Sequence, residues 1–200
     1  RRQRQMCIRD SAKGLLPRGK SGAFALAVTL MAAQGLQAQG GTLRPQIVEP
    51  DGFTVIGIEV RTSNAEAATA IPREWDRFFK EGIPGKTPNR ADAGFVVVYS
   101  GYASDHYSDY DYLIGSRVRD GSPAPEGMVV KQVPKARYAV VTTARGPVGK
   151  VVSEAWQGIW SLERSAGLGG RRTYKTDFEV YDQRSRDPNN SQVDIYVGVE

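Results

Sequence analysis

The sequence predicts an α+β domain. Two duplicated β-α-β-β units share one antiparallel sheet, with two helices on one side of it and a cleft between the halves. Three observations predict this fold. The order strand, helix, strand, strand occurs twice, over about residues 46–120 and 128–200. Both helical segments carry apolar residues at three- and four-residue spacing. Short strand segments also recur at matching places, so that 97–99 aligns with 179–181 and 112–115 with 195–198.

Length and charge indicate one ordinary globular domain. The chain has 200 residues, of which 40% are hydrophobic. Its net charge of +5 comes from the first 38 residues, which hold seven of the 27 Lys and Arg but one of the 22 Asp and Glu. Residues 39–200 therefore carry 20 basic and 21 acidic side chains. This region lacks the excess of basic side chains that is typical of nucleic-acid-binding proteins, so we expect no direct nucleic-acid binding.

The cysteine count excludes several kinds of site. Cys7 is the only cysteine, so residues 8–200 contain no disulfide, no thiol nucleophile and no cysteine metal cluster. The acidic segment 105–111 matches no calcium-loop spacing. We therefore expect neither a metal site nor a cofactor.

The first 38 residues are not expected to belong to the fold. Residues 1–11 look like a translated sequencing-adapter remnant, and the alternative is a native basic tail. Residues 12–38 have the basic flank, short apolar core and small-residue end of a signal peptide, and the alternative is a buried helix. We expect cleavage after Ala38 and a mature domain at 39–200. It would be periplasmic or secreted, with no stable membrane anchor.

The first unit begins with a strand at 53–62. Ser63 and Asn64 then precede a helix at 65–81, whose start could be as late as Ile71 if Pro72 lies in the first turn. Residues 94–101 and 110–119 are predicted strands that form a hairpin. The polar segment 102–109 between them is predicted to be a solvated loop.

The second unit repeats this order. Residues 128–145 are strand-like, with a bend or an interruption expected at Pro134. Gly146 and Pro147 open a helix that ends near Ser165. Strands are then expected at 172–182 and 192–199. The first of these is rich in aromatic and β-branched residues.

Glu179 is the main candidate for a functional residue. Side chains alternate along a strand, so Glu179 shares a face with Tyr181, and Tyr99 is the repeat partner of Tyr181. A carboxylate beside aromatic rings on a rigid strand suits a site for an organic cation. The alternative is a solvated carboxylate paired with Arg172 or Lys175. The alignment of the two halves favours a functional role for Glu179, because the first half has Val97 at the equivalent position.

The other candidate residues are aromatic. Cation–π contacts and hydroxyl groups could complete a ligand cleft around Glu179. The candidates are Tyr112, Tyr196, Trp75 and Trp160. His106 is the only histidine, and its neighbours in one short loop are poorly placed to form a catalytic triad. We therefore expect His106 to be solvated.

The sequence resembles the GyrI-like, or AraC-type, effector-binding domain family over residues 46–200. The matching segments are 133–140, 145–148, 156–160, 177–181 and 196–199. The resemblance implies a stand-alone member with a duplicated β-α-β-β fold and a pocket for lipophilic, often cationic compounds. The buried glutamate of the family maps onto Glu179. We find no helix-turn-helix segment in the chain, unlike the transcription regulators of this family.

We therefore predict an exported protein that binds small amphipathic or cationic molecules, with Glu179 as counter-ion. The alternative that the resemblance implies is a hydrolase of reactive electrophiles, with Glu179 as general acid or base. We rank it lower because we find no second strong catalytic group. A third reading is a partner-binding module. The sequence leaves the ligand and the oligomeric state open.

Overall fold

The computed structural model describes residues 43–119 and 121–200. The predicted adapter remnant and signal peptide lie outside these residues. The elements are β1 (Gln46–Val48), β2 (Phe53–Thr62), α1 (Ala67–Lys80), α2 (Ile83–Lys86), β3 (Phe95–Ser100), β4 (Tyr110–Val118), β5 (Val129–Val133), β6 (Tyr138–Thr142), α3 (Val148–Arg164), β7 (Thr176–Tyr181), the 3₁₀ helix η1 (Gln183–Ser185) and β8 (Asp194–Gly198).

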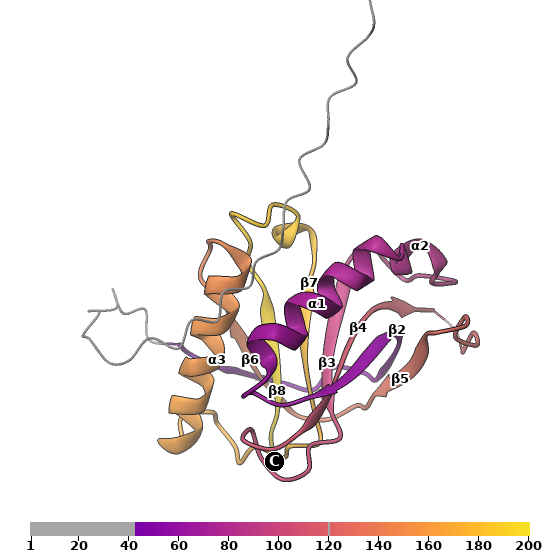
Figure 1. The fold of residues 1–200 in the computed structure, drawn as a ribbon. Coiled ribbons are helices and arrows are strands. Elements are labelled where there is room, and N and C mark those ends of the chain that lie inside the picture. Colours follow the sequence, from indigo (N-terminus) through magenta and orange to yellow (C-terminus); the bar gives the residue numbers. More distant parts are fainter. Residues whose placement is uncertain (1–42, 120) are drawn as a thin grey trace, which may run out of the picture.

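The fold is the predicted α+β arrangement. All the strands belong to one antiparallel sheet with the order β1-β6-β8-β7-β3-β4-β2-β5. The two long helices pack on the same face, since Trp75 and Phe78 of α1 and Trp156 and Ile159 of α3 belong to one apolar core (Figure 1). α2 is an additional single turn that the sequence analysis did not predict.

The two halves meet at the centre of the sheet. β3 pairs with β7, and Val97 lies directly opposite Glu179 in that pair. The order β6-β8-β7 on one side mirrors β2-β4-β3 on the other, as expected for a duplication with an approximate two-fold axis. The sequence alignment of Val97 with Glu179 fits this register, because an axis between equivalent residues of two antiparallel strands makes them neighbours.

The strand-like segment 128–145 is interrupted at Pro134, which is one of the two possibilities that the sequence left open. Pro134 has no N–H to donate, and the chain leaves the sheet there. β5 pairs with β2 in the first half, whereas β6 pairs with β8 in the second. The sequence analysis also missed β1, which pairs with β6. Each half thus contributes its first short strand to the edge of the other half.

The sheet curls strongly around the face away from the long helices. Phe53 of β2 and Phe178 of β7 are three strand spacings apart, about 14 Å in a flat sheet. Their ring centroids lie 5.3 Å apart. This curvature buries Phe178 and Tyr138 in a second apolar cluster, to which none of the helices in residues 43–119 and 121–200 contributes a side chain. β7 therefore has a buried side chain on either face.

Strand and helix bounds differ from the predictions in informative places. α1 begins at Ala67, with Pro72 inside it. β7 begins at Thr176, not at 172, because Tyr174 has a φ of 53° and Arg172 forms only an isolated bridge with Val199.

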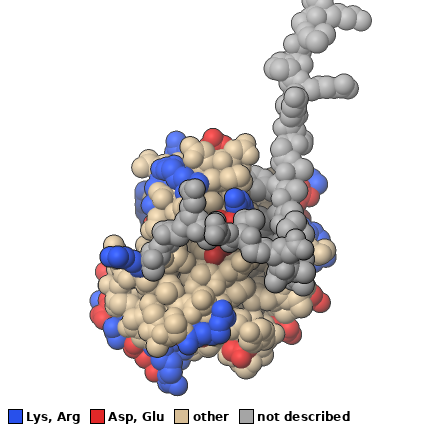
Figure 2. Space-filling view, turned by 90° about the vertical axis from the view of Figure 1, so that its left-hand side faces the viewer, with Lys and Arg blue, Asp and Glu red and all other residues tan. Residues whose placement is uncertain are grey.

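Figure 2 shows one face of the molecule, on which Lys and Arg are interspersed with Asp and Glu. Among the described residues, none of the helices is long and apolar enough to cross a membrane.

Candidate functional site

A cavity of about 650 Å³ lies between the two long helices and the sheet. The helix side chains that line it include Trp75 of α1 and Trp156 and Trp160 of α3. The centre of the sheet contributes Glu179 and Tyr99, one from each half. The cleft between the halves that the duplication predicted is therefore present, and its volume is within the range of small-molecule sites.

Glu179 is the polar centre of this cavity. Its side chain is 1% exposed. Its Oε1 accepts hydrogen bonds from the Tyr99 hydroxyl at 2.8 Å and from Trp156 Nε1 at 2.6 Å. Its Oε2 accepts one from the Tyr181 hydroxyl at 2.6 Å. Among residues 43–119 and 121–200, no Lys, Arg or His forms an ion pair with this carboxylate.

Burial sets the protonation of this group. Desolvation raises the pKa of Glu179 above its ordinary value, and the bonds from Tyr181, Trp156 and Tyr99 oppose that rise. Burial and the nearby carboxylate raise the pKa values of Tyr99 and Tyr181, so both hydroxyls keep their protons. Within the part of the chain that the structure describes, the ionised form of this acid is thus stabilised by neutral donors alone.

Strand alternation explains why these groups converge. Glu179 and Tyr181 point to the helix face of β7, and Phe178 points to the opposite cluster. Tyr99 and Tyr112 are paired across β3 and β4, so they share that helix face. Trp75 Nε1 donates to the Tyr112 hydroxyl at 3.0 Å, which fixes both rings in the cavity wall.

The structure brings six of the seven predicted site residues to this cavity and separates Tyr196 from them. Tyr99, Tyr112, Tyr181, Glu179, Trp75 and Trp160 line it. Tyr196 pairs with Phe178 and stacks on its ring at 4.3 Å, on the other face of the sheet. The alignment of the two halves explains why Tyr196 lies on that face. It matches Tyr196 with Leu113, which belongs to the same cluster on the face away from the long helices.

Trp156 was not among the predicted site residues. Its place in the apolar spacing of the predicted second helix is typical of a core residue, and Trp156 does pack in the core. Its indole nevertheless donates to Glu179. The available signal was the four-residue spacing between Trp156 and the predicted Trp160, which puts both on one helix face.

The prediction that His106 is solvated is wrong. Its side chain is 13% exposed, and its ring stacks on Trp160 at 5.3 Å and 12°. The Asn64 amide holds the loop by donating to the His106 carbonyl oxygen at 2.6 Å. The Tyr174 hydroxyl donates to Glu163 Oε1, so its oxygen accepts from His106 Nδ1 at 3.0 Å. The loop between β3 and β4 therefore forms one end of the cavity.

Arg172 does not pair with Glu179, contrary to the alternative that the sequence left open. Its Nη2 lies 2.6 Å from Asp177 Oδ2, and both side chains are buried. The Tyr102 hydroxyl also donates to Asp177 at 2.7 Å. Arg172 therefore pairs with Asp177, and with Glu163 at 3.4 Å, so that Glu179 is without a cationic partner among the described residues. Within the same residues, no group of three His, Cys, Asp or Glu is placed to hold a metal ion.

Comparison with known proteins identifies the family of this chain. The model of the family Cass2, integron-associated effector binding protein, matches residues 46–199. YobU of Bacillus subtilis, a putative transcriptional regulator protein, is 31% identical over 150 residues, which cover 72% of this chain and 90% of YobU. The transcriptional regulator BrlR of Pseudomonas aeruginosa is 34% identical over 168 residues. That match covers 78% of this chain but 56% of BrlR.

Solved structures agree on the fold. The integron cassette protein VCH_CASS2 of Vibrio cholerae superposes with a TM-score of 0.59 at 25% identity, over 78% of this chain and 96% of that one. SAV2435 bound to tetraphenylphosphonium gives a TM-score of 0.65 at 18% identity, over 79% and 94% of the two chains. The second likeness shows the fold alone. The chain belongs to the Cass2 family of integron-associated effector binding proteins, and its fold is that of GyrI-like effector-binding domains.

Proposed function

We propose that this protein binds a lipophilic organic cation in the cavity between its halves, with Glu179 as the counter-ion. The family supports binding of a small molecule. The finer proposal rests on one observation: Glu179 is buried in a cavity with three neutral donors and no cationic partner among the described residues.

The energetics favour a cationic ligand. Removing a carboxylate from water costs several kcal/mol, and neutral hydrogen bonds offset that cost only in part. A cation that enters the cavity supplies the missing charge. Tyr99, Trp75 and Trp156 line the cavity with aromatic rings, and each cation–π contact with a ring face contributes roughly 0.5–2 kcal/mol. A ligand with delocalised or shielded charge is preferred because it loses little hydration on entry.

The test uses tetraphenylphosphonium as a probe and calorimetric titration of the full chain. We expect Glu179→Gln to bind it at least about tenfold more weakly, because the ion pair is lost while the shape of the side chain is kept. The control is Glu154→Gln, an exposed carboxylate on α3 that lies outside the cavity. Equal affinity of Glu179→Gln and wild type would refute the counter-ion role.

The Glu179→Gln variant also distinguishes a binding protein from the alternative, a hydrolase. A cavity carboxyl with a raised pKa is also a candidate general acid or base. A hydrolase would convert an electrophilic substrate over many turnovers, and Glu179→Gln would abolish conversion. A binding protein yields no product with either form.

Export also remains our proposal, based on the signal-like residues 12–38. Expression of the full chain in a Gram-negative host, followed by fractionation and N-terminal sequencing, tests it. A periplasmic product that begins at Gln39 is expected. An unprocessed product in the cytoplasm would contradict export.

A further inference from the structure

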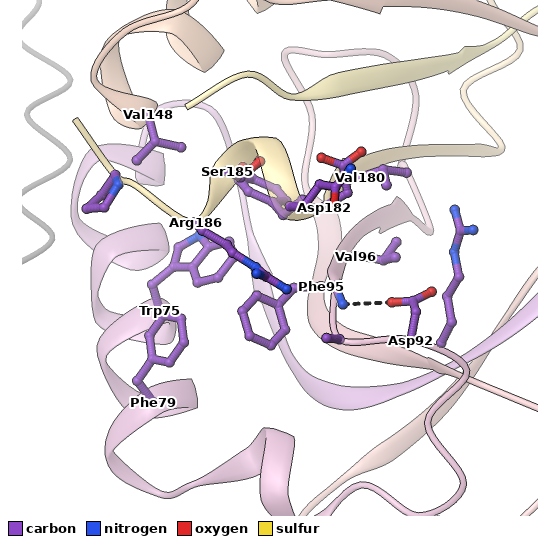
Figure 3. Close-up of a pocket in the computed structure, with 16 residues that line it drawn as sticks. Trp75, Phe79, Asp92, Phe95, Val96, Val148, Val180, Asp182, Ser185 and Arg186 are labelled. Atoms are coloured by element: carbon purple, nitrogen blue, oxygen red, sulfur yellow. Dashed lines mark hydrogen bonds between the residues drawn. The ribbon is translucent and has the colours of Figure 1, made fainter. Parts of the chain in front are cut away.

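The cavity of Glu179 is bordered at one end by the loop between β3 and β4, from which His106 and Tyr107 line it. Trp75 and Tyr181 also line a second cavity of about 780 Å³ (Figure 3), to which this loop contributes no residue. His106 therefore belongs to the first cavity alone. It is a polar group of that cavity that the function proposed above does not use.

Aromatic contacts and one hydrogen bond fix the imidazole of His106. Its ring stacks on Trp160 with centroids 5.3 Å apart, and the centroid of the Tyr107 ring lies 4.1 Å from its own. Its Nδ1 lies 3.0 Å from the hydroxyl oxygen of Tyr174, which donates its own proton to Glu163. Nδ1 therefore carries the hydrogen of the bond to Tyr174. The other polar atom of the ring is Nε2.

Nε2 of His106 is an accessible hydrogen-bond acceptor. In a neutral imidazole with its hydrogen on Nδ1, Nε2 has a lone pair. Burial lowers the pKa of His106, although Glu163 opposes that change, so the ring is neutral at neutral pH. Nε2 forms no hydrogen bond with residues 43–119 and 121–200. It is not enclosed by those residues either, so a ligand can reach it.

We propose that His106 Nε2 accepts a hydrogen bond from an O–H or N–H group of the cation that the cavity binds. The ligand then has a diffuse positive charge, which pairs with Glu179, and a donor group, which His106 recognises. A cation without a donor lacks this second contact and binds more weakly. The inference rests on the function proposed above, because it adds a second requirement for the same ligand.

The test is calorimetric titration of the full chain, near neutral pH, with pairs of phosphonium probes. Each of the ortho, meta and para isomers of (hydroxymethylphenyl)triphenylphosphonium is compared with its methyl ether, which has no donor. We expect at least one isomer to bind wild type about three- to tenfold more tightly than its ether, as expected for one hydrogen bond. Three isomers that each bind no better than their ethers would overturn the proposal.

A substitution separates the hydrogen bond from the packing of the ring. His106→Phe keeps a ring against Trp160 but has no acceptor, so the preference for the hydroxymethyl probe should disappear. Its affinity for tetraphenylphosphonium, which has no donor, should stay within about threefold of wild type. The control is Glu154→Gln, outside the cavity, which should keep the preference. A preference that persists unchanged in His106→Phe would also overturn the proposal.

A measurement on wild type alone examines the same atom. His106 is the only histidine, so long-range proton–nitrogen correlation spectra of the chain without a histidine tag report its tautomer directly. We expect a hydrogen on Nδ1 and none on Nε2. The Nε2 resonance should shift when the hydroxymethyl probe binds and shift less with the ether. A hydrogen on Nε2 in the free protein at neutral pH would overturn the proposal.

The same titrations separate this inference from the function on which it rests. Glu179→Gln should weaken both members of each probe pair and leave the ratio of their affinities unchanged. If Glu179→Gln binds every probe as wild type does but the preference depends on His106, the counter-ion role fails and the role of His106 stands. If Glu179→Gln weakens binding but no isomer is preferred, the role of His106 fails alone. If wild type binds none of the phosphonium probes, both fail.

Discussion

Three side chains hold the carboxylate of Glu179, and each donates through a group without charge. Tyr99 comes from one half, and Tyr181 and Trp156 come from the other. A cationic donor such as Arg172 would have neutralised the carboxylate permanently, but Arg172 is paired with Asp177. At the scale of single residues, the buried Glu179 carboxyl therefore has hydrogen-bond donors but no cationic partner among the described residues.

The first prediction concerns the pH dependence of stability. The pKa of Glu179 in the folded protein is raised above its unfolded value of about 4.3. Its contribution to stability is therefore fully present below that value and is lost as pH rises through the folded pKa. The Glu179→Gln variant has no titrating carboxyl at this position, so it does not lose stability in this way. As pH rises from about 4, the Tm of wild type without ligand should fall relative to that of Glu179→Gln. Parallel Tm curves, measured by differential scanning fluorimetry, would contradict a raised pKa.

The sequence predicted the residues that a strand pattern can place. Glu179, Tyr181 and Tyr99 follow from alternation and from the repeat. His106 could not be placed in this way, because its position depends on a loop that the Asn64 amide and the Tyr174 hydroxyl hold back against Trp160. Such long-range contacts have no periodic signature in the sequence.

At the scale of elements, curvature of the sheet decides what each strand face contacts. Gly57 of β2 lies directly opposite Gly115 of β4. A Cβ on Gly57 would collide with the backbone of Ile114 and Gly115. The absence of side chains at this pair lets the two strands approach closely where the sheet curls. The sequence analysis assigned both strands correctly, but periodicity carries no information on their curvature.

The second prediction is that Gly57→Ala destabilises the protein by about 2 kcal/mol or more, because backbone atoms cannot move aside as a flexible side chain can. Gly85→Ala is the matched control, since a Cβ there meets nothing within 4 Å. Urea denaturation of both variants measures the difference. Equal stability of the two variants would show that the close approach at Gly57 is not required.

At the scale of the whole molecule, the two halves are joined by more than the linker at 121–127. β3 pairs with β7 at the centre. At the edges, β1 pairs with β6 and β5 pairs with β2, so each half carries a strand of the other. The duplication was readable from the sequence. The exchange of edge strands could not be predicted from the sequence, because it depends on pairing between distant segments on either side of Pro134.

The third prediction follows from this exchange. A protease site inserted beside Gly121, which is exposed, should allow cleavage without separation of the halves. The cleaved protein should elute as one species in size-exclusion chromatography and unfold in one transition. Separation into two independently folded fragments would show that the halves are autonomous domains.

We propose that Glu179 selects a cationic ligand by its charge. The most direct measurement compares the affinities of methyltriphenylphosphonium and neutral triphenylphosphine oxide, which share three phenyl rings, for wild type and Glu179→Gln. We expect wild type to prefer the phosphonium by at least about tenfold, and we expect this preference to disappear in Glu179→Gln. Equal affinities in wild type, or a preference that persists in Glu179→Gln, would contradict it.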